Sequence, residues 1–269
     1  MPERLLGPLA APHFVVCGAR DRTKEALRRA LPRRRARVTF ARASSDLLDT
    51  LRTALVDGVV VDLGQPNDET WAAAALAREF PSIPFFAYGG LRPAELPLLA
   101  RATTLEFADC IAEGVEDDLA RDLMAPATFT VRFATALRGA EGRLGLETPL
   151  QHEAWTYIVA QGGRTVRTDA IAAAVGLTRE HLSRRFASDG APNLKRVIDL
   201  VRLLAAAELA KNPGYDLPDV ARVLGFASAS HLSGSCQRLV GVKSTSLARL
   251  RPLDLIDRFV KQGRGRSRG

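Results

Sequence analysis

Short apolar runs alternate with amphipathic stretches between His13 and Met124. The runs predict strands at 13–18, 38–41, 58–63, 84–88 and 107–111, and the stretches predict helices at 23–31, 44–55, 68–80, 93–102 and 116–124. The run Val59–Val61 is continuous and β-branched, which is typical of a strand buried on both faces of a parallel sheet. Five strand–helix units of this size predict an α/β doubly wound domain over residues 1–124, with Ser44 as one helix N-cap.

The pattern changes to a helical period after residue 148. Seven helices are predicted, at 150–161, 169–175, 179–188, 193–211, 217–224, 228–240 and 245–250. The longest has most of its apolar residues on one stripe from Leu194 to Leu209 and ends at Asn212-Pro213-Gly214. Thr168 and Thr178 are the expected N-caps of the second and third helices. We therefore predict an all-α domain over residues 149–251.

Two further segments connect and extend these domains. Residues 125–148 form a predicted linker in which Phe129, Phe133 and Leu137 share one helical face, followed by a flexible hinge at Gly139–Gly145. Docking of that face on a neighbouring domain and docking on a second protomer explain it equally well. Residues 252–269 form a basic C-terminal tail, with an amphipathic turn or two at 253–260 and a Gly/Arg-rich end from Lys261 that we expect to be disordered when free. The tail can also bind phosphate nonspecifically.

A near-repeat marks the helical half. The segment Ile171–Leu177 is echoed 49 residues later by Val220–Phe226, and each copy ends a short helix at a glycine, Gly176 or Gly225, before a second helix begins. Glycine is the residue that adopts the left-handed turn conformation without steric cost. A single helix–turn–helix is a weak signal, but two units joined by a long helix favour a double DNA-reading domain.

Charge is distributed unevenly along the 269 residues. The formal net charge is +8, and residues 149–269 contain 19 Lys and Arg against 10 Asp and Glu, whereas residues 1–148 contain 19 against 20. The positive excess lies entirely in the half that holds the repeat. This is where neutralisation of DNA phosphates requires it.

The helical half resembles the DNA-binding domain of the AraC/XylS family of transcription regulators. The motifs that carry this resemblance are Ile171-Ala172, Gly176-Leu177-Thr178 and Leu182–Phe186 in the first unit, and Val220-Ala221, Gly225-Phe226 and Gly241-Val242 in the second. The second turn has one extra residue, as in the family. The resemblance implies that a long helix fixes two helix–turn–helix units whose recognition helices enter successive major grooves, about 34 Å apart.

The first recognition helix has the richer set of base-reading side chains. Leu182 and Phe186 are expected inward, which leaves Arg179, Glu180, Ser183 and Arg184 facing DNA. Arginine binds guanine in bidentate fashion, glutamate accepts from cytosine, and serine is permissive. The resemblance places Arg184 where the family has a DNA-contacting arginine.

The second recognition helix departs from the family. Ala227 stands at the usual capping position, Gly234 at the usual contacting arginine and Cys236 at the usual core phenylalanine. Glycine inside a helix costs roughly 1 kcal/mol relative to alanine. We predict contacts to bases or to a thymine methyl from three small residues and contacts to the DNA backbone from two larger ones, so that the first unit dominates specificity. The five are Ser228, Ala229, Ser233, Gln237 and Arg238.

The N-terminal half resembles a response-regulator receiver domain over about 110 residues, on the run from Val59 to Pro66 that contains Asp62. The resemblance implies a flavodoxin-like fold, and Asp62 matches the aspartate that accepts phosphate. A receiver also needs an acidic pair to hold Mg²⁺. That place reads Cys17-Gly18-Ala19, with no carboxylate until Asp21, and the expected lysine falls at about Glu113. We therefore interpret Asp62 as a vestigial phosphoacceptor that lacks metal and counter-cation.

Other chemistry is not expected. The three cysteines, Cys17, Cys110 and Cys236, are isolated among apolar neighbours and lack metal-ligand spacing, which favours buried thiols over nucleophiles. We predict no enzyme activity, metal or cofactor. The longest apolar run is too short to span a membrane, and a cytoplasmic protein is expected.

The sequence therefore predicts a transcription regulator that binds double-stranded DNA. Its pseudo-receiver domain would serve homodimerisation, through that domain or through the helix at 125–138, or input from a protein partner. Two alternatives remain: a genuine phospho-regulated response regulator that uses Asp62, and a protein-interaction adaptor with weakened DNA binding.

Overall fold

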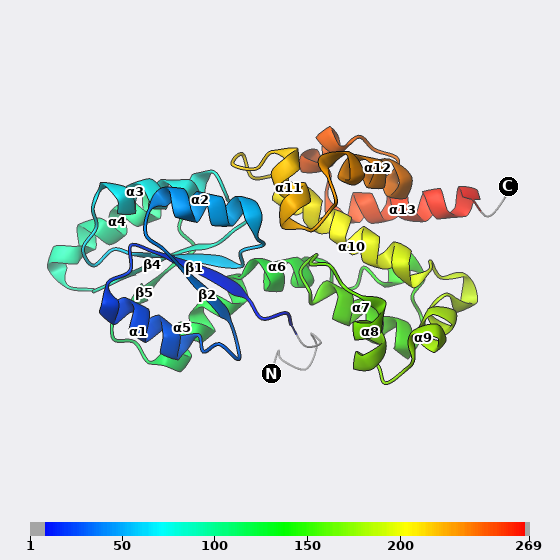
Figure 1. The fold of residues 1–269 in the computed structure, drawn as a ribbon, viewed down its shortest axis with the longest axis horizontal. Coiled ribbons are helices and arrows are strands. Elements are labelled where there is room, and N and C mark those ends of the chain that lie inside the picture. Colours follow the sequence, from blue (N-terminus) through cyan, green and yellow to red (C-terminus); the bar gives the residue numbers. More distant parts are fainter. Residues whose placement is uncertain (1–8, 267–269) are drawn as a thin grey trace. The chain divides into compact units, whose positions relative to one another are not determined.

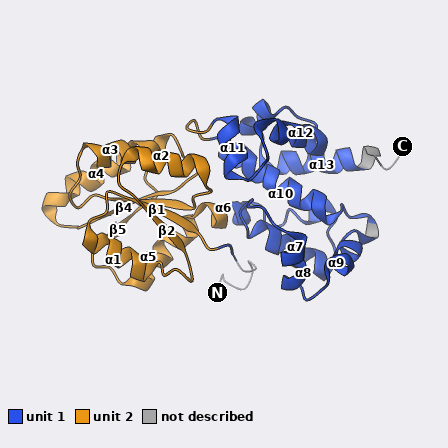
Figure 2. Cartoon of the chain, viewed as in Figure 1, with its two compact units in different colours: residues 1–10, 133–211, 216–269 blue, residues 11–132, 212–215 orange. Residues whose placement is uncertain are grey.

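Residues 9–266 are described by the computed structural model, and they form two compact units (Figure 2). The α/β unit comprises residues 11–132 and 212–215. The helical unit comprises residues 133–211 and 216–266 together with Leu9 and Ala10.

The α/β unit is built on a five-stranded parallel sheet in the order β2-β1-β3-β4-β5. The strands are β1 (His13–Cys17), β2 (Arg37–Ala41), β3 (Gly58–Asp62), β4 (Phe85–Gly89) and β5 (Asp109–Ala112). This order is that of the flavodoxin-like doubly wound fold. β1, β3 and β4 are buried along their whole length, as the apolar runs predict. In the register, Cys17 pairs with Val61, so the ends of β1 and β3 lie side by side.

Helices cover both faces of this sheet (Figure 1). They are α1 (Asp21–Ala30), α2 (Ser44–Thr53), α3 (Asp68–Ala75) with the 3-10 turn η1 (Leu76–Arg78), η2 (Pro93–Glu95) with α4 (Leu96–Thr104), α5 (Asp117–Met124) and η3 (Ala125–Ala127). α1 packs on α5, and α2 packs on α3. The core beneath α1 and α5 joins Phe14 and Val16 of β1 to Phe86 of β4, Ile111 of β5 and Met124 of α5.

The helical unit is organised around α10 (Leu194–Leu209), which contacts α7, α11, α12 and α13. The other elements are α7 (Pro149–Val159), α8 (Thr168–Ala174), α9 (Arg179–Phe186), η5 (Ser188–Gly190), α11 (Leu217–Val223), α12 (Ala229–Val240), η6 (Ser244–Arg249) and α13 (Pro252–Arg266). α10 is buried on nearly every side, which explains why its apolar residues extend beyond a single stripe.

Several predicted boundaries differ from the structure. The expected hinge at 139–145 instead contains η4 (Gly142–Leu144), with Ala140 and Leu144 buried. The helix expected at 245–250 is the 3-10 segment η6. The tail continues as helix α13 to Arg266, because its residues Leu255, Ile256 and Phe259 form a buried apolar face; residues 267–269 of the predicted tail lie outside the described residues.

The linker forms α6 (Phe129–Ala136). Its predicted stripe of Phe129, Phe133 and Leu137 is buried within the chain itself. Among residues 9–266, no helix combines the length and the apolar character needed to span a membrane.

Candidate nucleic-acid interface

The two predicted turns have the same backbone geometry. Gly176 and Gly225 both adopt left-handed φ angles, +69° and +67°. One residue later, the N–H of Leu177 donates to the carbonyl of Ala172 at 2.9 Å, and the N–H of Phe226 donates to that of Ala221 at 2.8 Å. This backbone bond closes a helix C-terminus of the Schellman type. The near-repeat in the sequence is thus a repeat in structure.

In the first helix–turn–helix, α9 is capped at its N-terminus and packed against the core. Thr178 is its N-cap, as predicted, and the Thr178 hydroxyl accepts from the backbone N–H of His181 at 3.3 Å. Leu182 and Phe186 are both fully buried on the inner face. Thr168, in contrast, does not cap α8: it is the first helical residue and follows Arg167, whose side chain makes no capping bond.

The predicted DNA-facing side chains of α9 all lie on its outer face. Arg179, Glu180, Ser183 and Arg184 are exposed. The Arg179 side chain is 64 % exposed and has a long ion pair, 4.0 Å, with Asp169. Because an exposed pair of that length contributes little, the guanidinium remains available to a phosphate or a base.

A buried amide from another helix holds the end of α9. Gln151 of α7 is only 1 % exposed, and its Nε2 donates to the carbonyl of Phe186 at 2.9 Å. Its Oε1 accepts from the backbone N–H groups of Glu147 and Thr148. Gln151 therefore links the N-terminus of α7 to the C-terminus of the recognition helix.

In the second helix–turn–helix, the recognition helix α12 starts one residue later than predicted. The N-cap of α12 is Ser228, not Ala227, and the Ser228 hydroxyl accepts from the N–H of His231 at 3.0 Å. The extra residue of this turn is absorbed before the cap. Leu232 and Cys236 are fully buried, at the positions that Leu182 and Phe186 occupy in α9.

The predicted contact residues of α12 are not equally placed. Gln237 and Arg238 are exposed, and Ser228 is exposed but occupied as the cap. Ala229 is half-buried. Ser233 is half-buried as well, and its hydroxyl lies 2.8 Å from that of Ser244 in η6. The structure thus turns the Ser233 side chain toward its own fold.

The end of α12 is also held by an amide from a neighbouring helix. In the amide orientation that satisfies both partners, Gln262 of α13 donates to the carbonyl of Arg238 and accepts from the N–H of Gly241, each at 3.0 Å. Gln262 thereby has the role for α12 that Gln151 has for α9. α13 is a structural part of the second unit, although its sequence was expected to leave the fold after Val260.

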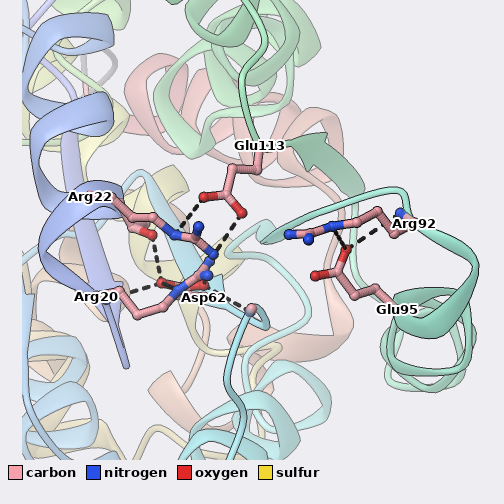
Figure 3. Close-up of polar contacts among 8 residues, drawn as sticks. Arg20, Arg22, Asp62, Arg92, Glu95 and Glu113 are labelled. Carbon is pink, nitrogen blue, oxygen red and sulfur yellow. Dashed lines mark hydrogen bonds and ion pairs between the residues drawn. The ribbon is translucent and has the colours of Figure 1, made fainter.

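Asp62, the vestigial phosphoacceptor, lies at the end of β3 with a fully buried side chain (Figure 3). Arg20, just before α1, covers it: Nε donates to Oδ2 at 2.8 Å and an Nη donates to Oδ1 at 2.6 Å. The carboxylate also accepts from the backbone N–H of Arg20, from the hydroxyl of Thr23 and from the N–H of Gly64. Five donors thus saturate the two oxygens.

The ion pair continues outward from Asp62 (Figure 3). The Arg20 guanidinium lies 3.6 Å from a carboxylate oxygen of Glu113, which directly follows β5, and Glu113 is paired in turn with Arg22 at 2.7 Å. Burial by itself raises the pKa of Asp62, but the hydrogen bonds from Arg20, Thr23 and Gly64 outweigh it and the pKa is lowered. The pKa of Arg20 is raised, chiefly by its hydrogen bond to Asp62.

The residues around Asp62 do not fit a Mg²⁺ ion. Such an ion needs several oxygen ligands, and the positions where a receiver has its acidic pair are Cys17 and Gly18. A Cβ on Gly64 would overlap the Arg20 guanidinium, so glycine at that position makes room for the arginine. The sequence interpretation correctly noted the missing acidic pair but was wrong to leave Asp62 without a counter-cation, because Arg20 is that cation.

The cysteines match the interpretation as buried thiols at two positions of three. Burial raises the pKa of Cys17 and of Cys236 to about 11. Cys110 is half-buried, and burial raises its pKa too. Among the described residues, no group of three or more His, Cys, Asp or Glu side chains is placed to hold a metal ion.

The fold and these sites define a chain with a receiver-like α/β domain and a double helix–turn–helix, which is the architecture of a DNA-binding transcription regulator. Residues 171–249 match the family model described as "Helix-turn-helix domain", which is of the AraC type and covers both units. Among the curated proteins, none matches the chain.

Several solved structures are similar to the chain. Full-length FixJ from B. japonicum is 16 % identical, with 84 % of this chain and 96 % of that chain covered and a TM-score of 0.38. A response regulator from Thermotoga maritima is 18 % identical, with 44 % and 98 % covered and a TM-score of 0.38. RcsB from Salmonella enterica serovar Typhimurium, bound to promoter rprA, is 15 % identical, with 70 % and 97 % covered and a TM-score of 0.34. At such scores the strand order, rather than these likenesses, defines the fold.

Proposed function

We propose that this protein is a sequence-specific transcription regulator whose α9 and α12 read two adjacent major grooves of one duplex. The observation that carries the proposal is the placement of Arg179 and Arg184. Both guanidinium groups are on the exposed face of a helix whose opposite face, Leu182 and Phe186, is fully buried. A side chain on a helix that is packed in this way keeps its orientation when DNA binds. Reading the edge of a nucleobase requires such a fixed orientation.

The remaining face of α9 supports base reading as well. Glu180 and Ser183 are exposed beside the two arginines. Arginine can bind guanine and glutamate can accept from cytosine, so a helix that exposes both can distinguish the two bases, whereas contacts to phosphates carry no sequence information. The positive charge of residues 149–269 supplies the salt-dependent part of the affinity.

Binding of the full-length protein to DNA tests this proposal. The probe is a duplex enriched from a randomised library, and its affinity is measured by fluorescence anisotropy over a salt series. We expect Arg184→Ala to weaken binding by about 1–3 kcal/mol, because one bidentate pair is lost. Arg34→Ala is the matched control, since Arg34 is an exposed arginine of the α/β unit, and it leaves the affinity unchanged. Absence of salt-dependent binding to any duplex would refute the proposal and favour the adaptor alternative.

We further propose that the α/β unit is a pseudo-receiver that is not switched by phosphorylation. A carboxylate has about four lone-pair positions, and Asp62 accepts five hydrogen bonds, three of them from Arg20. No oxygen of Asp62 is then available to attack phosphorus unless Arg20 leaves. Incubation with acetyl phosphate and Mg²⁺ should therefore give no phosphoryl adduct by intact mass. A lasting adduct that disappears in Asp62→Asn would instead support the phospho-regulated alternative.

The α/β unit is also the proposed surface for homodimerisation. Two leucines one turn apart on α5, Leu119 and Leu123, are 50 % and 38 % exposed. Side chains four residues apart are neighbours on a helix surface, so the two leucines can form one apolar patch that a second copy would cover. Light scattering should report a dimer for the wild type and a monomer for Leu119→Lys/Leu123→Lys. A monomeric wild type, or a double variant that stays dimeric, would contradict this surface.

A further inference from the structure

Gly234 occupies the position on α12 that Arg184 occupies on α9. Arg184 lies between the buried Leu182 and Phe186, and Gly234 lies between the equally buried Leu232 and Cys236. Each is two residues after the first buried position and two before the second. The outward face of α12 therefore has no side chain where the first unit has its central arginine.

Another arginine lies over this bare position. Arg238 is one helical turn after Gly234, and its Nη1 is 3.2 Å from the place that a Cβ on Gly234 would take. Its Nη2 donates to the hydroxyl of Ser235 at 3.1 Å. Long side chains on a helix lean toward its N-terminus and cover the preceding turn. The guanidinium thus extends toward the surface of Gly234, and the residue remains exposed.

Within the described part of the chain, the hydrogen-bond partner of the Arg238 guanidinium is a neutral hydroxyl, which leaves the positive charge uncompensated. Ser235 is neutral and nearly buried, and its hydroxyl donates in turn to the carbonyl of His231 at 2.9 Å. This bond orients the guanidinium without neutralising it. Two of the small polar residues here already have partners in the chain, since Ser228 caps α12 and the Ser233 hydroxyl contacts that of Ser244.

We propose that Arg238 is the guanine-reading arginine of the second unit and that Gly234 provides the space for it. The second recognition helix then selects sequence as the first does, rather than adding affinity alone through the DNA backbone. The inference rests on the proposed function, because it assigns a role in duplex reading to one residue of the same interface.

The test is selection of bound duplexes from a randomised library by the full-length protein. The wild type is expected to enrich two sequence blocks one helical turn apart. Arg238→Lys retains the positive charge but loses the planar fork that binds guanine. It should lower the preference for guanine in the second block by roughly 5- to 150-fold and leave the first block intact. Arg249→Lys, at another exposed arginine of the same unit, is the control and should retain both blocks.

A second variant tests the role of the glycine. Gly234→Leu fills the space beside the Arg238 guanidinium with a good helix former, so the second block should be lost while the melting temperature does not fall. A second block that survives either Arg238→Lys or Gly234→Leu overturns the inference, although the proposed function stands as long as two blocks are selected. A wild type that enriches no sequence overturns the proposed function itself, and the inference with it.

Discussion

Replacing Arg20 by glutamine should destabilise the protein markedly, although residue 20 makes no predicted contact with DNA. The Asp62 side chain is fully buried, and Arg20 supplies its positive partner through two side-chain hydrogen bonds. Removing one partner of a buried ion pair costs roughly 3–5 kcal/mol, because a desolvated charge is left behind. Three donors remain: Thr23, Gly64 and the backbone N–H of residue 20. We therefore expect a loss of about 3 kcal/mol, a large part of the 5–15 kcal/mol typical of a folded domain.

Urea unfolding of the purified protein measures this loss. Arg22→Gln is the matched control: Arg22 pairs with Glu113 at 2.7 Å, but its side chain is 54 % exposed. An exposed pair of this kind contributes about 0–1 kcal/mol. The midpoint should fall strongly in Arg20→Gln and little in Arg22→Gln.

The dependence on pH separates an ion pair from simple packing. In the wild type the pKa of Asp62 is lowered, so its contribution to stability is complete above the unfolded-state pKa of about 3.9 and disappears as the pH falls through the folded-state pKa. In Arg20→Gln, the hydrogen bonds from the guanidinium no longer offset the effect of burial. The folded-state pKa of Asp62 should therefore rise above the unfolded-state value. The variant then gains relative stability on acidification, and its deficit shrinks between about pH 7 and pH 4. A deficit below about 0.5 kcal/mol at neutral pH, or one that is constant with pH, would refute the ion-pair argument.

Three further outcomes follow from the helical unit and the thiols. Thr178→Ala should lower stability by about 1 kcal/mol through loss of the α9 cap, and Thr178→Ser should restore it in thermal melts. Gln151→Leu leaves the buried carbonyl of Phe186 without its donor and should cost about 1–3 kcal/mol; an unchanged melting curve would contradict the role given to that amide. Cys17 and Cys236, with pKa values raised to about 11, should resist iodoacetamide at neutral pH until urea unfolds the chain, as intact mass would report.

The order of the elements could be predicted because the hydrophobic period changes sharply along the chain. Buried parallel strands require continuous apolar runs, and Val59–Val61 is such a run. The two glycine turns were predictable for a related reason: Gly176 and Gly225 end apolar-periodic helices, and both adopt left-handed φ angles in the structure. These features are local in sequence, so pattern alone identifies them.

Cap positions and segment ends were harder to predict. The sequence pattern places caps at Ser44, Thr168 and Ala227, and in the structure each cap lies one residue away, at Ala43, Arg167 and Ser228. At the start of α2, for example, the N-cap is Ala43, and the carboxylate of Asp46 accepts from its backbone N–H. Capping depends on which backbone N–H groups remain unpaired, and tertiary packing decides this as much as residue type does.

The Arg20–Asp62 pair was missed because it is made by the register of the sheet. Residues 20 and 62 are distant in sequence, and they meet because Cys17 pairs with Val61 at the ends of β1 and β3. The sequence did contain a signal. The acidic pair is absent after β1, and Glu113 reverses the charge expected after β5. Relative to a receiver domain, the surroundings of Asp62 differ in charge at these two places. Such differences indicate that an arginine, rather than a metal ion, neutralises the aspartate.

The chain departs from the expected motifs at two places, the Asp62 site and the second recognition helix α12. At each place an arginine compensates for the missing residues, but the two arginines have opposite roles. At the Asp62 site, Arg20 is largely buried and pairs with a carboxylate, so its charge is neutralised inside the fold. On α12, Arg238 is exposed and hydrogen-bonded to a neutral hydroxyl, so its charge remains available to a ligand. Loss of the first guanidinium should therefore lower stability and leave the selected DNA sequence unchanged, whereas Arg238→Lys should change the selected sequence and leave stability unchanged. Effects that appear together in both variants would show that burial and pairing do not distinguish structural from reading arginines in this protein.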